Sequence, residues 1–552
     1  MSPSVGPFTG GLLVTVNGRG FVTPDQSPNT VTIGGAACAN VITVDDGTLT
    51  CQSPSGTPGF RADVVVTNSR GTGRLSRGFT YLTPAAPKSD LNGDGVADIV
   101  VSAALDDTAG TDAGAVFVIL GTDAPGGVPN ATPASAQIRL YGYKAGDNFG
   151  ASVCTGDVNG DGHDDLVVGA DRCDSGSVSD SGSAYVFYGP LTGPTISAAA
   201  ADVKLWGETT VAGDRFGGRV ELGDVTGDGK ADLVVSAVCH DEAAGTAGAK
   251  VDTGCVYVFR GGAPITSAVA NSASVEIYGE RANDQAGTSV STGDLNGDGL
   301  MDTVVGVPLF DITTPVLVQN TGGVHVFFGT PGVASRSISD ADATFLGQAF
   351  DDQFGSSVAI ADVNNDGTVD LIVGAPNHDT NEVNAGRVYV FFGGAAFAGK
   401  GADLADVKLS GLPNQDAFGS SLCAADVNGD AVSDIVIGAP MADYFNDRNG
   451  RAYVFLGGAS LTDAVASQAG VIFNGEPVTL DMFGSTVSVA DVNDDGYVDV
   501  LSASTQNGGG AGRLYIFRGD RLSPQKNASQ ADTTVSGSTA SMKLGTAVAH
   551  GQ

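Results

Sequence analysis

Apolar residues along most of this chain occur in short runs, separated by glycine-rich turns and aspartate-rich loops. One unit shows the pattern: FGASVCTG (149–156) leads into an acidic loop, and DLVVGA (165–170), SAYVFYGP (183–190) and KLWGE (204–208) follow. Such runs, rich in Val, Tyr and Phe and without a helical period, predict β-strands, and their nearly continuous apolar character predicts cover on both faces. Each unit is therefore expected to be a four-stranded sheet.

This unit is repeated along the chain. Acidic loops of one pattern begin at intervals of 67, 67, 70, 68, 64 and 65 residues, at Asp90, Asp157, Asp224, Asp294, Asp362, Asp426 and Asp491. A fixed period of this length indicates a solenoid, a propeller or an array. The first unit lacks a leading strand, whereas the chain ends on LGTAVAHGQ (544–552), which aligns with FGASVCTGD (149–157). A last strand that completes the first unit closes a ring, so residues 90–552 predict an all-β, seven-bladed β-propeller whose first blade is completed by 542–552.

The N-terminal segment, residues 1–83, has a different pattern. Short apolar segments (LLVTV, TVTIGG, ADVVVTN and FTYL) alternate with Gly, Pro and Asn turns. Roughly seven short strands in about 85 residues predict a small Ig-like β-sandwich. TPAAPKSD follows, and we expect residues 84–89 to form a short, stiff linker to the propeller.

The acidic loops carry the clearest chemistry. They read DLNGDGVAD, DVNGDGHDD, DVTGDGKAD, DLNGDGLMD, DVNNDGTVD, DVNGDAVSD and DVNDDGYVD. Positions 1, 5 and 9 are always Asp, position 3 is Asn or once Thr, and position 7 varies freely, as expected where only its carbonyl oxygen binds. Five oxygen donors in nine residues suit Ca²⁺, which takes about six to eight oxygen ligands, whereas zinc prefers His or Cys and magnesium takes fewer protein ligands. The predicted ligands of up to seven Ca²⁺ ions are Asp90, Asn92, Asp94, Val96, Asp98, Asp157, Asn159, Asp161, His163, Asp165, Asp224, Thr226, Asp228, Lys230, Asp232, Asp294, Asn296, Asp298, Leu300, Asp302, Asp362, Asn364, Asp366, Thr368, Asp370, Asp426, Asn428, Asp430, Val432, Asp434, Asp491, Asn493, Asp495, Tyr497 and Asp499.

An EF-hand is excluded as the type of calcium loop. It needs a bidentate Glu at position 12 and a helix after it, but in five repeats that position lies inside a β-type run, at Val168, Val235, Val305, Val373 and Ile437. A Gly- and Asp-rich turn without metal is the simpler alternative. Against it, three carboxylates crowded into each turn would repel one another. Position 6 is Gly except for Ala431, which predicts a positive φ angle there.

Both segments are similar to known families. The N-terminal segment resembles the IPT/TIG family of Ig-like modules in PFTGGLLVTVNGRGF, VTIGGAAC, LTCQSPSGTPG and the closing GFTYL. Residues 85–552 resemble the FG-GAP repeats of integrin α-subunit propellers, through the acidic loops, the YVFFGG endings, the GAP tripeptides at 374–376 and 438–440, and the FG pairs beginning at 149, 216, 354, 418 and 483. Integrins carry the calcium loop in only some blades, and here no interval is long enough for an inserted I-type domain. Integrin partners and signalling are therefore not carried over.

The resemblance implies a binding surface. Integrin-type propellers bind partners with the rim opposite the calcium loops, so a protein or glycan ligand is expected there. The longest connections of that rim are expected at 239–255 and 309–323. Aromatic residues cluster near the other connections, where they either fill the central ring between blades or bind a ligand: Tyr141, Tyr143, Trp206, Tyr278 and Phe345.

Composition limits the partners. The formal net charge of −35 argues against nucleic acid and anionic membranes, which need clustered Lys and Arg. No run of about 18 apolar residues and no secretory signal pattern is present, so we expect no membrane span and a mature form or an excised piece. The pairs Cys38–Cys51 and Cys239–Cys255 are either local disulfides or small buried side chains, and Cys154 and Cys423 are expected core thiols.

No catalytic agent is visible. The chain has five His and no H-E-x-x-H or G-x-S-x-G motif, so neither a nucleophile with its base nor an open metal position is apparent. The tripeptide RGD at 518–520 is a known adhesion motif, but it aligns with the strand ending YVFRGG (257–262) and is interpreted as a strand end. Asn130 and Asn527 lie in glycosylation sequons, relevant only in a host that glycosylates secreted proteins.

The sequence thus predicts a non-enzymatic, extracellular or cell-surface calcium-binding propeller, preceded by an Ig-like domain, that acts in adhesion or ligand binding. A structural module of a larger surface protein is one alternative. A carbohydrate-binding or accessory part of a secreted hydrolase is another. Oligomeric state does not follow from the sequence.

Overall fold

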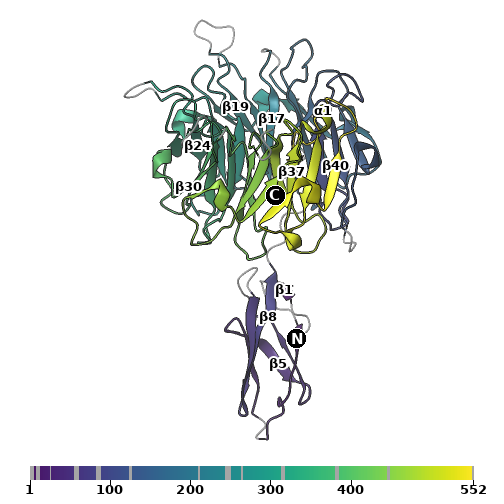
Figure 1. Cartoon of the computed structure of the whole chain (residues 1–552), viewed down its shortest axis with the longest axis vertical. Helices are drawn as coiled ribbons and strands as arrows, with labels where there is room; N and C mark the ends of the chain where they lie inside the picture. The colour runs from purple at the N-terminus through teal and green to yellow at the C-terminus, as the bar shows by residue number, and fades with distance from the viewer. Residues whose placement is uncertain are drawn as a thin grey trace. The chain divides into compact units, whose positions relative to one another are not determined.

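The computed structural model describes residues 5–7, 13–24, 27–54, 61–82, 89–122, 127–208, 212–242, 250–262, 265–312, 317–332, 334–379, 384–413, 415–443 and 448–549. Two compact units are formed, one by the N-terminal segment and one by the repeats (Figure 1). Both are built from strands, and in the described residues the α-helix is confined to the single turn α1 (Asn507–Gly510). The predicted all-β fold class is confirmed.

The N-terminal unit is a sandwich of two sheets, with strand orders β1-β8-β7-β3-β4 and β2-β6-β5. Alternating residues of each strand face the core, so that Val14, Val16, Val31, Leu49 and Phe79 are buried between the sheets. This is the predicted Ig-like architecture. Its strands are β1 (Val5–Pro7), β2 (Leu13–Asn17), β3 (Thr30–Ile33), β4 (Ala36–Ala37), β5 (Ala39–Thr43), β6 (Thr48–Gln52), β7 (Arg61–Asn68) and β8 (Gly71–Leu82).

The repeats form seven antiparallel sheets in the described residues, each with four main strands. The first sheet contains β9 (Ile99–Ala103), β10 (Ala115–Ile119), β11 (Ile138–Tyr141) and the C-terminal β41 (Val548–Ala549); the second β12 (Phe149–Gly156), β13 (Asp165–Ala170), β14 (Ser183–Phe187) and β16 (Val203–Trp206); the third β17 (Phe216–Gly223), β18 (Asp232–Ala237), β19 (Cys255–Phe259) and β21 (Val275–Tyr278); the fourth β22 (Ser289–Gly293), β23 (Asp302–Val307), β24 (Gly323–Phe327) and β26 (Ala343–Leu346); the fifth β27 (Ser357–Ala361), β28 (Asp370–Ala375), β29 (Arg387–Phe391) and β30 (Val407–Ser410); the sixth β31 (Ser421–Ala425), β32 (Asp434–Ala439), β33 (Arg451–Phe455) and β35 (Val471–Asn474); the seventh β36 (Phe483–Ala490), β37 (Asp499–Ser504), β38 (Arg513–Phe517) and β40 (Thr533–Ser536).

Short elements link neighbouring sheets. Five short strands pair in parallel with the fourth strand of the preceding sheet: β15 (Ile196–Ser197), β20 (Ala268–Val269), β25 (Arg336–Ser337), β34 (Ala464–Val465) and β39 (Gln525–Asn527). Single 3-10 turns accompany the sheets: η1 (Pro133–Ser135), η2 (Ala198–Ala200), η3 (Ala270–Ser272), η4 (Ile338–Asp340), η5 (Ala402–Leu404), η6 (Ala466–Gln468), η7 (Gly519–Arg521) and η8 (Ala528–Gln530).

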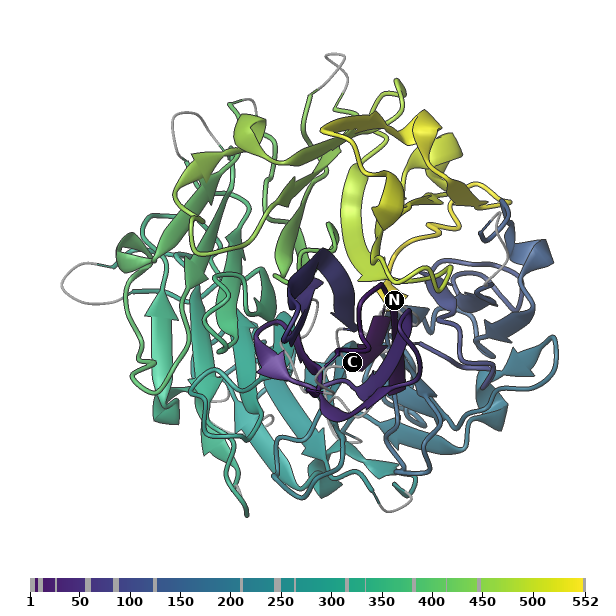
Figure 2. The same ribbon diagram turned by 90° about the horizontal axis from the view of Figure 1, so that it is seen from below.

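The seven sheets are arranged radially around a central axis (Figure 2). The first strands of successive sheets lie side by side around that axis, and β41 lies beside both β12 and β36. β41 pairs antiparallel with β9, with Val548 opposite Val101 and Ala549 opposite Val100. The last strand of the chain therefore belongs to the first sheet of the repeats, while residues 550–552 of the predicted completing segment lie outside the described residues.

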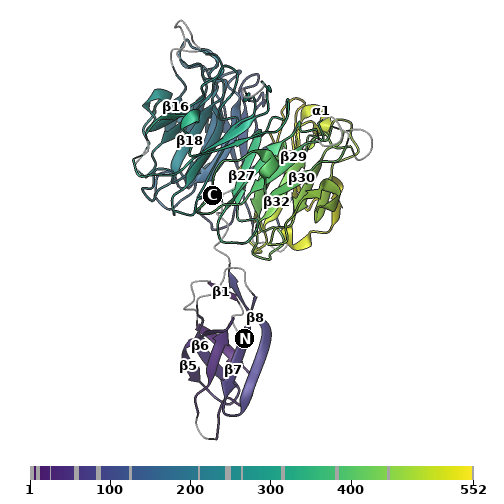
Figure 3. The same cartoon turned by 90° about the vertical axis from the view of Figure 1, so that its left-hand side faces the viewer.

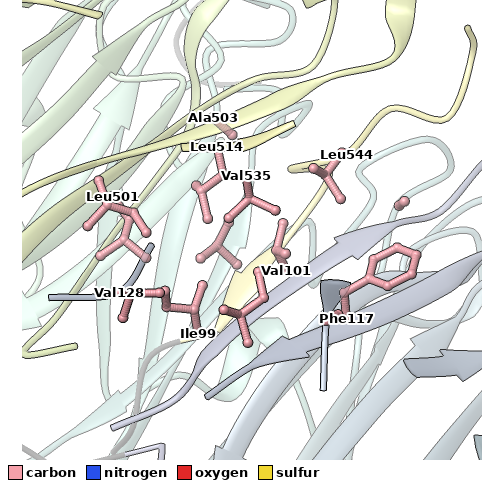
Figure 4. Close-up of a cluster of buried hydrophobic side chains, with 14 of the residues drawn as sticks. Ile99, Val101, Phe117, Val128, Leu501, Ala503, Leu514, Val535 and Leu544 are labelled. Atoms are coloured by element: carbon pink, nitrogen blue, oxygen red, sulfur yellow. The ribbon is translucent and has the colours of Figure 1, made fainter. Parts of the chain in front are cut away.

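Apolar side chains fill the space between adjacent sheets. Between the seventh and first sheets, Val101 and Phe117 pack with Leu501, Leu514 and Leu544 in one cluster (Figure 4). The fifth and sixth sheets are seen from the side in Figure 3. The second strands, such as β28 and β32, are buried along their whole length because a neighbouring sheet covers each face. This explains the nearly continuous apolar runs of the sequence.

The FG pairs are packing residues of these interfaces. Phe216 is fully buried, and its ring makes an edge contact with Tyr257 at 5.5 Å between centroids. Gly217 has φ of +91°, and a Cβ there would lie 2.3 Å from the carbonyl oxygen of Ser183 in the adjacent sheet. Glycine is therefore required where two sheets approach most closely.

The aromatic residues of the fourth strands do not fill the central ring. They lie on or just after β11, β16, β21 and β26, the outermost of the four main strands of their sheets. Phe345 is fully buried between the fourth and fifth sheets against Phe391, whereas Tyr143 is 40% exposed. The central-ring interpretation is wrong, because the first strands of the sheets, not the fourth, lie beside one another around the axis.

All seven cysteines are free thiols in the structure. The structure contains neither of the two proposed local disulfides, although the side chains of Cys38 and Cys51 are in contact. Cys154 and Cys423 are buried in clusters between sheets, as expected for core thiols.

Candidate metal centres and the opposite rim

The ninth residue of each acidic loop begins the second strand of its sheet in six repeats and directly precedes β9 in the first, and this Asp is at most 1% exposed in all seven repeats. In the second loop, Asp165 Oδ2 accepts the N–H of Val158 at 3.0 Å. Its Oδ1 accepts the N–H of Gly189 at 2.9 Å, in the turn after the third strand. The second bond recurs in each of the other six repeats, from the N–H groups of Gly121, Gly261, Gly329, Gly393, Gly457 and Gly519. The ninth Asp thus ties the loop to the following turn.

The first, third and fifth side chains are turned toward the backbone of their own loop. Asp157 Oδ1 accepts the N–H groups of Gly160 and Asp161, and its Oδ2 accepts that of Gly162 at 2.8 Å. The sixth residue closes this turn with a left-handed backbone, with φ of 86° at Gly162 and 72° at Ala431. The predicted positive φ is confirmed, including at the one repeat where the residue is not glycine.

Carboxylates of each loop lie close enough to disfavour one another's charge. Burial, together with the like charges of Asp94 and Asp90, raises the pKa of Asp98 to about 7. Burial with a like-charged loop neighbour also raises the pKa of Asp165, Asp302 and Asp370 to about 6. Concentrated negative charge in a small oxygen-lined loop favours a bound cation.

The residues of the loops fit calcium chemically. Every side-chain donor is an oxygen, and each ninth carboxylate that accepts two N–H groups still has lone pairs for an ion. In the fifth loop the buried Oδ1 of Asn364 has no hydrogen-bond partner. Across the described chain, the three carboxylates of a loop do not bring one oxygen each within 4.8 Å of the other two. The main role of the ninth Asp is thus to accept backbone hydrogen bonds. The side chains at the first, third and fifth positions would be the main ligands of a bound ion.

The RGD tripeptide faces the acidic loops. Arg518 is 13% exposed, and its guanidinium contacts Asp495 Oδ2 at 2.7 Å and Asp520 Oδ1 at 3.0 Å. Both charged residues of the tripeptide are paired with each other, and Arg518 also neutralises the fifth residue of the seventh loop. The interpretation of RGD as a strand end agrees with this geometry.

The rim opposite the acidic loops is formed by the ends of the second and fourth strands and the starts of the first and third. Most large apolar residues exposed on the repeats lie in its connections: Tyr143, Val251, Leu317, Phe350, Val478 and Leu480. The predicted long connections 239–255 and 309–323 belong to this rim, although residues 243–249 and 313–316 lie outside the described ones.

A second acidic position, which the loop spacing did not reveal, lies on this rim. Each FG or equivalent pair of the second to seventh sheets is preceded, two residues earlier, by an Asp that is at most 3% exposed: Asp147, Asp214, Asp284, Asp352, Asp416 and Asp481. The signal was available as an Asp-x-Phe-Gly repeat. In the third sheet, Asp214 meets Glu208 and His240.

Comparison with known proteins gives two family matches. The IPT/TIG domain matches residues 1–81, and the FG-GAP repeat matches six segments: 86–119, 149–187, 286–327, 354–391, 418–455 and 483–517. Between residues 188 and 285 no segment is matched, yet the structure there has the same sheet and the same loop. None of the helices in the described residues has the length and hydropathy to cross a membrane.

Similar proteins fall into two groups. Bovine phosphatidylinositol-glycan-specific phospholipase D is 30% identical over 279 residues, covering 48% of this chain and 32% of the phospholipase. Integrin alpha-8 of chicken is 29% identical over 246 residues, covering 42% of this chain and 21% of the integrin. Rat integrin alpha-7 is 35% identical over 174 residues, covering 31% and 14%. The aligned regions thus span a third or less of each of these relatives.

Proposed function

Because this chain is an IPT/TIG domain followed by FG-GAP repeats of the integrin α type, we propose that it is an extracellular or cell-surface module that binds a protein or glycan ligand. One rim of the propeller contacts the ligand. Calcium in the loops of the opposite rim stabilises the blades.

The observation that carries the proposal is the unequal distribution of exposed apolar residues. Val251, Leu317 and Phe350 come from connections of the third, fourth and fifth sheets, and all three are about half exposed or more. They stand on neighbouring blades of one rim, and the connections that bear them differ in length and sequence from repeat to repeat. Exposed apolar residues on variable loops of a rigid scaffold are typical of recognition surfaces.

Calcium has a structural part in this proposal. Loops of the same construction recur in every blade, as a scaffold requires and a single active site does not. Extracellular calcium sites of this kind bind at about 10⁻⁴ to 10⁻³ M, which suits the calcium level outside cells. The net charge of −35 supports cation binding and disfavours nucleic acid as a partner.

Array binding in calcium tests the proposal. The labelled chain is applied to glycan and extracellular-protein arrays, alongside a variant with Val251→Ser, Leu317→Ser and Phe350→Ser. A control variant carries Met301→Ser and Leu456→Ser, which replace exposed apolar residues near the acidic loops. We expect native and control chains to capture the same ligand and the rim variant to lose it. Equal capture by all three chains, or none by the native chain, would contradict the proposal.

The similarity to phospholipase D favours a second candidate, an accessory part of a secreted hydrolase. The aligned region covers about a third of that relative, so its activity is not transferred to this chain. A release assay on a glycosylphosphatidylinositol-anchored protein distinguishes the candidates. We expect no release by this chain alone; calcium-dependent release would overturn the non-enzymatic proposal.

A further inference from the structure

One cluster outside the acidic loops brings three metal-binding side chains together. Glu208 follows β16, Asp214 precedes the FG pair of β17, and His240 follows β18. One ligand atom of each lies within 4.8 Å of the other two, and no other such trio of His, Cys, Asp or Glu occurs among the described residues. All three lie on the rim opposite the acidic loops, because the second and fourth strands end there and the first begins there.

Asp214 lacks the partners that a buried carboxylate needs. It is 1% exposed, and neither of its oxygens takes part in a hydrogen bond. The nearest cationic atom is Nδ1 of His240, at 3.8 Å from Oδ2, which is too long for a hydrogen bond. A buried carboxylate without a partner is strongly unfavourable. A positive ion bound here would satisfy the carboxylate, since no cationic atom of the described chain lies at bonding distance from it.

The rest of the cluster is already arranged. The Tyr257 hydroxyl lies 3.4 Å from Glu208 Oε1 and 3.4 Å from His240 Nδ1, so one group positions both side chains. His240 is 13% exposed, which leaves the site open to the rim.

The equivalent positions of the fifth and seventh repeats differ from those of the third in how their acidic side chains are compensated. In the fifth sheet, Asp352 Oδ2 accepts the N–H of Ala349 at 2.8 Å and lies 3.1 Å from His378 Nδ1. Gln348 stands there in the place of Glu208, and its Oε1 accepts the Tyr389 hydroxyl. The fifth sheet therefore places the same kinds of side chain at these positions, but it has one carboxylate fewer, and its Asp352 accepts a hydrogen bond.

The seventh sheet satisfies its cluster in another way. Asn507 takes the place of the histidine and donates to Asp481 Oδ1 at 2.8 Å. Arg513 pairs with Glu476, the counterpart of Glu208, at 2.9 Å. In these repeats a protein group compensates each acid, whereas the third repeat keeps two carboxylates, an imidazole and no bonded counter-ion.

We propose that Glu208, Asp214 and His240 bind one divalent transition-metal ion of the zinc type, separate from calcium in the acidic loops. An imidazole nitrogen with two carboxylate oxygens suits zinc and its neighbours, whereas calcium prefers oxygen ligands alone. Three protein ligands leave a position open toward the rim, where water or an acidic group of a partner can coordinate. The assignment is independent of calcium binding and of the proposed ligand.

Cobalt binding tests the site on the full chain. The chain is stripped with chelator, supplied with excess Ca²⁺ to fill the acidic loops, and titrated with Co²⁺ as a spectroscopic substitute for Zn²⁺. We expect one Co²⁺ per chain, with visible d–d absorption that Zn²⁺ abolishes. Asp214→Asn and His240→Gln should each weaken uptake at least tenfold. The control His378→Gln, at the equivalent position of the fifth repeat, should leave uptake unchanged.

A second variant is designed to create a metal site instead of removing one, so that its expected result cannot be produced by misfolding. Gln348→Glu creates in the fifth repeat the combination found in the third, so we expect it to bind a second Co²⁺. Circular dichroism and the melting temperature show whether each variant folds. A native chain that takes up no Co²⁺ in calcium, or uptake that Asp214→Asn and His240→Gln leave unchanged in folded chains, overturns the assignment.

Discussion

The sixth residue of each acidic loop has a left-handed backbone, and only Ala431 carries a side chain there. Its φ of 72° compares with 83° to 91° at the six glycines. An L-residue with a Cβ is strained in this region by about 1 kcal/mol relative to glycine. We expect Ala431→Gly to raise the free energy of unfolding by about 1 kcal/mol. Gly162→Ala should lower it by a similar amount, since no atom lies within 4 Å of the added Cβ and only backbone strain is introduced. Chemical denaturation in chelator measures both, and a change of the same sign in the two variants would contradict the strain argument.

Two aspartates of one loop allow the ligand role and the structural role to be separated. Asp165 is buried and holds the N–H groups of Val158 and Gly189, whereas Asp161 is exposed and holds backbone of its own loop. Asp165→Ala leaves the buried N–H of Val158 and the partly buried N–H of Gly189 without this partner and should cost about 3 kcal/mol with or without calcium. Asp161→Ala should cost less in chelator and should lose stability mainly in calcium. Denaturation of both variants in Ca²⁺ and in EGTA checks this; an equal calcium effect on the two variants would contradict the division of roles.

Spacing in the sequence identifies contacts that are local and misses those that the sheets create. The ligand positions of a loop lie within nine residues, so the amino-acid sequence alone displays their pattern. The bond from Gly189 to Asp165 spans 24 residues and depends on the register of two strands. Asp214 likewise meets His240 only because β17 and β18 pair. The Asp-x-Phe-Gly repeat marked this Asp, but its partners follow from the fold alone.

Among the elements, the first and second strands of a sheet were the most predictable. FGASVCTG and DLVVGA coincide with β12 and β13, because apolar runs bounded by turn residues leave little choice of boundary. The two-residue strands β15, β20, β25 and β34 left no pattern in the sequence. Each forms by parallel pairing with the preceding sheet. These strands therefore depend on a contact with another sheet and not on a pattern in their own residues.

The C-terminal strand is the element whose removal is most informative. β41 covers the edge of β9, and Met542, Leu544 and Val548 belong to the apolar cluster between the first and seventh sheets. A chain ending at Ser541 loses these contacts, each worth about 1.5–3 kcal/mol, and exposes a strand edge. We expect a lower melting temperature and concentration-dependent self-association, measured by calorimetry and light scattering. A synthetic peptide of residues 542–552 should restore both; a truncated chain as stable and monomeric as the native one would contradict the pairing.

At the scale of the whole molecule, charge and fold act together. A chain with net charge −35 repels itself when compact, and the loops concentrate part of that charge within nine-residue turns. Seven Ca²⁺ ions would add fourteen positive charges and bring the formal charge to about −21. Because the loops sit at the same place in every sheet, stabilisation by these ions would be distributed around the whole propeller. No single blade should then unfold alone when calcium is present.

Calorimetry with and without calcium tests this directly. A site held at about ten times its dissociation constant contributes about 1.4 kcal/mol, so seven sites contribute about 10 kcal/mol if the propeller unfolds as one unit. With the unfolding entropy of a unit of this size, that corresponds to a rise of about 10 °C in the melting temperature. NaCl at matched ionic strength is the control, because it screens the net charge without occupying the loops. If calcium shifts the melting temperature no more than NaCl does, the ions do not hold the blades together.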